Sequence, residues 1–174
     1  MTVTRPRRAS PMVRQSRTRA VLHVDHIVTD TQLARLGLEG VGFPHRILTT
    51  RPLTGSTPQR DVTFYALRAE DLDHPGQLMH FAGVAAIRHS LQVPGEHWTL
   101  DLGGRGSRPD AVALLEGQHV AVEYDAGYHP REIRRKVRDF TAEYGRIIWG
   151  TPSSLRASRL QGNHPELEVH TVTY

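Results

Sequence analysis

The feature that most constrains this chain is a predicted hairpin within residues 108–125. Two apolar runs are separated there by Glu116–Gly117, which predicts two antiparallel strands joined by a tight turn. Asp110 opens the first run, whereas Glu123 and Asp125 close the second. Pairing brings Asp110 close to Glu123, and residues two apart on a strand share a face. Three carboxylates at one sheet end repel each other unless a cation lies between them, and a hard divalent ion such as Mg²⁺ prefers oxygen ligands.

Length and composition restrict the class of protein. A chain of 174 residues forms one ordinary domain or two small ones. It has no cysteine, so disulfides and thiolate metal sites are ruled out. No apolar run is long enough to cross a bilayer, and the first residues lack the apolar stretch of a secretory signal. We therefore expect a cytoplasmic protein without a membrane partner.

Arginine is concentrated at the N-terminus. The first 20 residues contain no acidic residue and six arginines: Arg5, Arg7, Arg8, Arg14, Arg17 and Arg19. Because residues 1–18 also have few large apolar groups, we expect a disordered basic tail. Such tails bind phosphate backbones without reading sequence. The alternative is a tail that only aids solubility.

Residues 19–75 are predicted to form a small winged-helix-like domain. Helices are expected over 19–28 and 29–36, and strands over 45–50 and 61–67. The glycine- and proline-rich residues 38–44 leave little room for the recognition helix that normally precedes such a ribbon. DNA reading, simple packing and homodimer formation all remain open for this part.

Residues 76–174 have a different pattern. Helices are expected over 77–91, from Pro130 to about Tyr144 and over 153–160, and strands over 97–102, 110–115, 119–124, 146–149 and 167–172. An apolar stripe of helical period, Ile133, Val137, Phe140 and Tyr144, predicts that the middle helix packs on the sheet. The predicted order is αβββαβ with one helix–strand pair appended, an α/β (α+β) fold.

This order and its carboxylates resemble the PD-(D/E)XK nuclease superfamily, whose core is restriction-endonuclease-like. With the winged-helix-like half, the chain is more narrowly similar to the replication-relaxation proteins. The residues that carry the resemblance are Pro109, Asp110, Glu123, Asp125, Gly127 and Lys136. It implies a DNA-binding protein that hydrolyses or nicks phosphodiesters with Mg²⁺ or Mn²⁺, held by Asp110 and Glu123 with the Tyr124 carbonyl as a further ligand.

One position departs from the family pattern. The family has lysine two residues after the glutamate, where it positions a water and stabilises developing charge, and this chain has Asp125 there. Asp125 is then expected to be a third ligand or a base. Lys136, the one lysine of the sequence, borders the apolar stripe of its helix and is the candidate replacement. Its alternative role is an amphipathic residue whose stem covers the core.

Other side chains are weaker candidates. His80 is predicted either to reach the metal site or to be structural, and Tyr128 and His129 to touch a phosphate or a water. Further phosphate contacts are expected from Arg105, Arg108, Arg134, Arg135 and Arg138. Two other functions remain: a catalytically inactive nuclease fold that holds DNA or a replication protein, and a transcription regulator whose winged half reads an operator.

Overall fold

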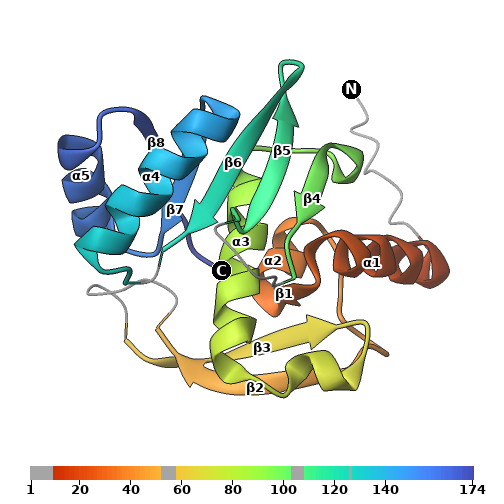
Figure 1. Ribbon diagram of the computed structural model, residues 1–174. Coiled ribbons are helices and arrows are strands. Elements are labelled where there is room, and N and C mark those ends of the chain that lie inside the picture. Colours follow the sequence, from red (N-terminus) through yellow and green to blue (C-terminus); the bar gives the residue numbers. More distant parts are fainter. Residues whose placement is uncertain (1–9, 52–57, 103–107, 126) are drawn as a thin grey trace, which may run out of the picture.

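The computed structural model describes residues 10–51, 58–102, 108–125 and 127–174, which form two sheets with helices around them (Figure 1). The helices are α1 Pro11–Asp25, α2 Asp30–Arg35, α3 Pro75–Ser90, α4 Pro130–Tyr144 and α5 Ser154–Asn163, with 3₁₀ turns at Ala69–Leu72 and Gly95–His97. The strands are β1 Ile27–Thr29, β2 His45–Thr50, β3 Arg60–Ala66, β4 Trp98–Leu100, β5 Ala111–Leu115, β6 Gln118–Tyr124, β7 Ile147–Thr151 and β8 Leu167–Thr171. The predicted mixed α/β class is confirmed. Across these ranges, each helix is too short or too polar to span a bilayer.

The smaller sheet has the antiparallel order β1-β3-β2. Strand β1 was not expected, because residues 19–28 were predicted to be helical throughout. The helix ends at Asp25, because the following residue, His26, has a φ of 65° outside the right-handed helical region. The β-branched residues after it pair with β3. The next predicted helix is present as α2, and Thr29 and Gln32 form a reciprocal capping box at its start. Residues 36–44 form turns and irregular backbone, so no recognition helix precedes β2.

Helix α1 corrects the expectation that residues 1–18 are disordered. It begins at Pro11, where Ser10 accepts a hydrogen bond from the Val13 amide. The Thr18 side chain is fully buried and donates to the Glu39 carbonyl at 3.0 Å. Tertiary contacts therefore order the second half of this arginine-rich stretch. Residues 1–9 lie outside the described part of the chain.

The larger sheet has the order β4-β5-β6-β7-β8. Its first three strands are antiparallel, and β6, β7 and β8 run parallel. Glu116 and Gly117 join β5 to β6 with φ values of 52° and 80°, the left-handed pair of a type I′ turn. From α3 to β7 the elements follow the predicted order αβββαβ, and α5 and β8 complete the sheet.

Helix α3 connects the two sheets in one hydrophobic core (Figure 1). Buried side chains of β3, such as Phe64, belong to the same cluster as Leu78 of α3 and Val122 of β6. On the opposite face of the larger sheet, α4 and α5 pack around Trp149. The two parts expected on either side of residue 75 therefore share their core. This arrangement leaves the carboxyl end of β6 between α3 on one side and α4 and α5 on the other.

Candidate active site at the end of strand β6

The hairpin brings Asp110 beside the end of β6, as predicted. Asp110 lies just before β5, and its Oδ2 accepts a hydrogen bond from the Tyr124 amide at 2.8 Å. Its Oδ1 lies 3.2 Å from Nε2 of His80 on α3. The Tyr124 ring packs on the α3 side of the sheet, where a side chain at Gly83 would overlap it. Asp110 is thus held by two elements that are distant in sequence.

Glu123 points to the other face of the sheet, towards α4. Its side chain is completely buried, and its Oε2 accepts a hydrogen bond from Lys136 Nζ at 2.8 Å. The second oxygen, Oε1, is buried without a hydrogen-bond partner. Burial and, secondly, the charge of Asp110 raise the pKa of Glu123 to about 8, although Lys136 opposes the shift. Oε1 of Glu123 can therefore still accept a hydrogen bond or bind a cation, and the surroundings of this side chain disfavour its negative charge.

Lys136 reaches Glu123 because of the apolar stripe of α4. Ile133, Val137 and Phe140 are buried against the sheet, and Lys136, at their border, is 8% exposed. Its Nζ lies 4.8 Å from the centre of the Tyr128 ring, a cation–π contact. The sequence-based expectation that Lys136 lies at the carboxylates is matched by this geometry.

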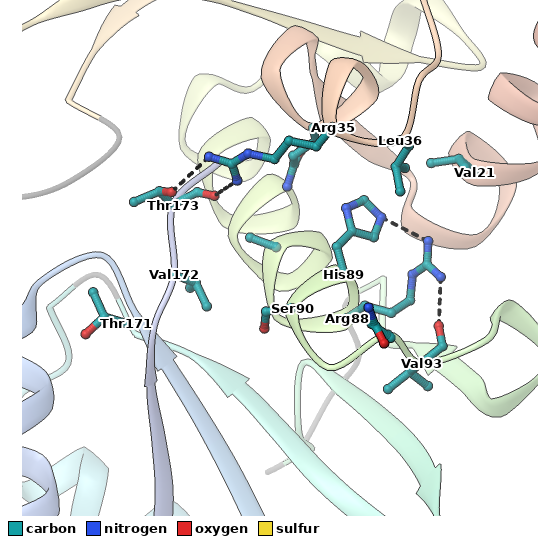
Figure 2. Close-up of a pocket in the computed structure, with 13 residues that line it drawn as sticks. Val21, Arg35, Leu36, Arg88, His89, Ser90, Val93, Thr171, Val172 and Thr173 are labelled. Carbon is teal, nitrogen blue, oxygen red and sulfur yellow. Dashed lines mark hydrogen bonds between the residues drawn. The ribbon is translucent and has the colours of Figure 1, made fainter. Parts of the chain in front are cut away.

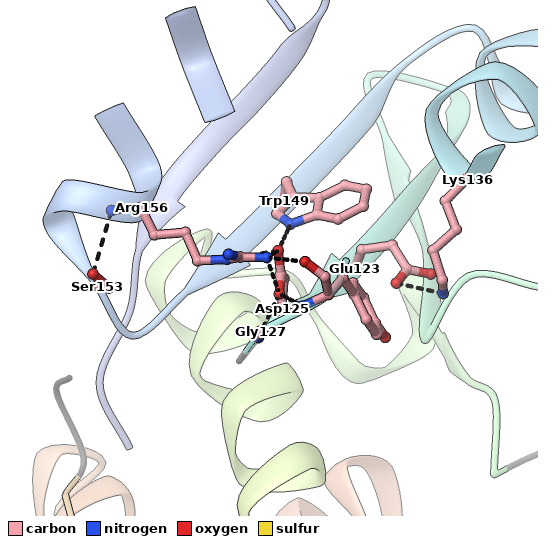
Figure 3. A network of polar contacts seen from close by, with 8 residues as sticks. Glu123, Asp125, Gly127, Lys136, Trp149, Ser153 and Arg156 are labelled. Atoms are coloured by element: carbon pink, nitrogen blue, oxygen red, sulfur yellow. Dashed lines mark hydrogen bonds and ion pairs between the residues drawn. The ribbon is translucent and has the colours of Figure 1, made fainter. Parts of the chain in front are cut away.

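Asp125 has a different environment from the one expected of a metal ligand or base. Its side chain is fully buried and both oxygens accept hydrogen bonds from Arg156, as Figure 3 shows. Oδ1 also accepts from the Gly127 and Tyr128 amides at 2.6 Å each, and Oδ2 accepts from the Trp149 indole at 3.3 Å. These donors fix the segment after β6 to α5 and leave little capacity for a metal. Arg156 was missed by the sequence analysis, since nothing local to it indicates a partner 31 residues away.

The residues around Glu123 provide hard donors of the kind that Mg²⁺ or Mn²⁺ requires. These donors are the carboxylates of Asp110 and Glu123. The buried Oε1 of Glu123 has no hydrogen-bond partner, and a bound cation would satisfy it. Within the described ranges, no group of three or more histidine, aspartate or glutamate side chains is arranged to hold a metal ion. Such an ion would therefore have two carboxylate ligands and would complete its shell with water, substrate or backbone oxygens such as the Tyr124 carbonyl.

The remaining candidates have separate positions. His129 caps α4, with Nδ1 accepting from the Arg131 amide at 3.3 Å. The Tyr128 side chain covers Lys136, and burial, followed by the charges of Asp110 and Glu123, raises the pKa of its phenol. Tyr128 thus contacts the lysine of the site, whereas His129 caps the helix that carries this lysine.

The predicted phosphate-binding arginines do not form one surface. Arg14, Arg17 and Arg19 lie on α1, whereas exposed Arg134, Arg135 and Arg138 lie on α4, on the opposite side of the molecule (Figure 1). Arg108 is exposed just before β5. Arg5, Arg7, Arg8 and Arg105 lie outside the described residues. The arginines of α4 lie nearer to the candidate active site than those of α1, because α4 also carries Lys136.

Two cavities adjoin opposite ends of α3. The larger, of about 720 Å³, is bounded by α1, α2, the end of α3 and residues 171–173 (Figure 2). Arg88 and His89 at its wall bind the fully buried Asp25, with Arg88 contacting both carboxylate oxygens, so these charges are satisfied within the protein. The second cavity, of about 590 Å³, lies between β2 and the start of α3 and is lined by His80 and Tyr124. It is the one that adjoins Asp110.

Comparisons of the chain with family models, curated proteins and solved structures gave no match.

Proposed function

We propose that this chain is a metal-dependent deoxyribonuclease with its active site at Asp110, Glu123 and Lys136. The single observation that carries the proposal is the state of Glu123: a fully buried carboxylate with one oxygen bound to Lys136 and the other without a partner. A buried unpaired acceptor costs about 1–3 kcal/mol, which a bound cation would relieve. The element order αβββαβ with the acids at one sheet end, which is the order expected of a restriction-endonuclease-like core, supports the same function.

The residues of the site divide the chemistry between them. Asp110 and Glu123 would hold Mg²⁺ or Mn²⁺, which supplies a water of lowered pKa and shields the phosphate when bound. Lys136 orients Glu123 and opposes the rise of its pKa, and its remaining N–H groups can donate to a phosphate oxygen or a water. Asp125 is assigned to positioning, because it ties Gly127 and Tyr128 to Arg156 beside the site.

A DNA-binding function without catalysis is the second candidate. The observation that favours it is the pair itself: Lys136 already binds Glu123 without a metal, and the family's lysine position is occupied by Asp125, which binds Arg156. In that case the chain would act by holding DNA or a replication protein.

Cleavage assays separate the two functions. Purified protein with Mg²⁺ or Mn²⁺ is expected to nick or cut at least one of supercoiled, linear, single-stranded or branched DNA. Asp110→Asn and Glu123→Gln should abolish cleavage, and Lys136→Met should slow it by about 10²–10³-fold, as for loss of one transition-state donor. Asp139→Asn, which changes a partly exposed acid on the same helix as Lys136, is the control that should keep full activity. Absence of metal-dependent cleavage of all four substrates would leave the binding function.

A further inference from the structure

The cavity between β2 and the start of α3 adjoins the candidate active site. His80 lines it and contacts Asp110 at 3.2 Å, and Tyr124, whose amide binds Asp110, also lines it. Two residues thus belong to both the cavity and the carboxylate site. A ligand in the cavity would therefore lie next to the two residues that hold Asp110.

The lining of the cavity has the chemistry of a pocket for a flat heteroaromatic ring. Its aromatic groups are His80, Tyr124 and Tyr174, and its aliphatic walls come from Leu48, Met79 and two prolines. Polar side chains come from Thr49, Thr50, Arg51 and Gln59, and none of the described residues that line it is acidic. A volume of about 590 Å³ lies in the range of small-molecule sites. Aromatic walls with a few polar groups stack and orient nucleobases.

We propose that this cavity receives one unpaired nucleobase, so that the preferred DNA has a nucleotide outside the double helix, at a bulge, flap or end. The inference rests on the proposed DNA function and adds the class of substrate. Stacking on aromatic side chains contributes about 1–3 kcal/mol per base. The expected preference for DNA with an unpaired base is therefore about 5- to 150-fold over the fully paired duplex.

Gly76 gives a way to close the cavity without disturbing the fold. It lines the cavity in the first turn of α3, and a Cβ built there meets no atom within 4 Å. Gly76→Phe therefore places a ring in open space at the cavity wall. Gly162 is the matched control, because it is also helical, its Cβ also meets no atom within 4 Å, and it lies on α5 away from the cavity. Both variants should keep the melting temperature of the unaltered chain.

The test is a binding titration in EDTA, where no cleavage occurs. The probes are a duplex with one bulged 2-aminopurine and its fully paired counterpart, followed by anisotropy and by 2-aminopurine fluorescence. We expect the unaltered chain and Gly162→Phe to bind the bulged duplex at least about 5-fold more tightly and to quench its fluorescence. Gly76→Phe should bind both duplexes equally. Equal binding by the unaltered chain, or an unchanged preference in Gly76→Phe, would overturn the pocket.

The result is independent of the cleavage assay. If Gly76→Phe removes the preference for the bulged duplex and no metal-dependent cleavage occurs, the results would support a nucleobase pocket in a protein that binds DNA without cutting it. Cleavage by the unaltered chain with no preference for the bulged duplex would support the nuclease and overturn the pocket.

Discussion

The buried pair of Asp125 and Arg156 provides the sharpest test of the structure. Both Asp125 oxygens accept hydrogen bonds from N–H donors, including two groups of Arg156. Asp125→Asn keeps the shape but replaces one oxygen with an NH₂ group. In either orientation this group faces other donors, and Arg156 loses its counter-charge. Loss of one partner of a buried pair costs about 3–5 kcal/mol. Because the Arg156 side chain is 30% exposed, we expect the lower end, about 3 kcal/mol.

The assay is urea unfolding at equilibrium, followed by circular dichroism and by tryptophan fluorescence, since Trp149 is buried against Asp125. Asp139→Asn breaks an exposed pair with Arg138, so it should change the free energy of unfolding by less than about 1 kcal/mol. Asp125→Lys introduces the lysine of the family pattern but places a second buried cation beside Arg156. It should therefore destabilise more than Asp125→Asn. An Asp125→Asn variant within about 1 kcal/mol of the unaltered chain would refute this account of the pair.

Two further predictions concern stability. Because the folded pKa of Glu123 is raised to about 8, this group stabilises the fold fully below its unfolded pKa and loses that contribution as pH rises through 8. The free energy of unfolding measured in EDTA should fall between the unfolded pKa of Glu123 and pH 8, by at most about 5 kcal/mol at 1.36 kcal/mol per pH unit. Glu123→Gln should remove that fall, and a parallel pH profile in the variant would argue against this role of Glu123. Gly83→Ala places a Cβ on the Tyr124 ring and should cost about 1–3 kcal/mol. Gly76→Ala in the same helix has open space and should be neutral or stabilising, so equal effects of the two in thermal melts would contradict the packing.

The sequence predicted those elements whose pattern is local. The Glu116–Gly117 turn and the period of the stripe through Phe140 were enough to place Asp110, Glu123 and Lys136 near one another. Each depends on backbone geometry that neighbouring residues determine: a two-residue turn defines the register, and a helical period defines which side faces the sheet. These predictions therefore agree with the structure to within a few residues.

The features that were not predicted depend on contacts between distant segments. Strand β1 is three residues long and exists because β3 pairs with it, which the apolar residues after His26 do not reveal. The first turns of α1 look like a polar tail in composition, although Ser10 and Pro11 are a recognisable helix start. Thr18 is ordered by a carbonyl 21 residues later. Composition thus gave the wrong prediction where a tertiary partner existed.

The pair Glu123 and Asp125 shows why residue pattern alone does not assign function at this site. The two acids are two residues apart, point to the same face of β6 and are equally buried. They differ in the helix that covers them: α4 brings a single ammonium to one oxygen of Glu123, whereas α5 and the backbone saturate both oxygens of Asp125. A carboxylate with an unused oxygen can bind a cation, and one whose oxygens are filled by fixed donors holds structure instead. The number of donors that surround each acid, rather than its place in a motif, therefore determines which one is available for chemistry.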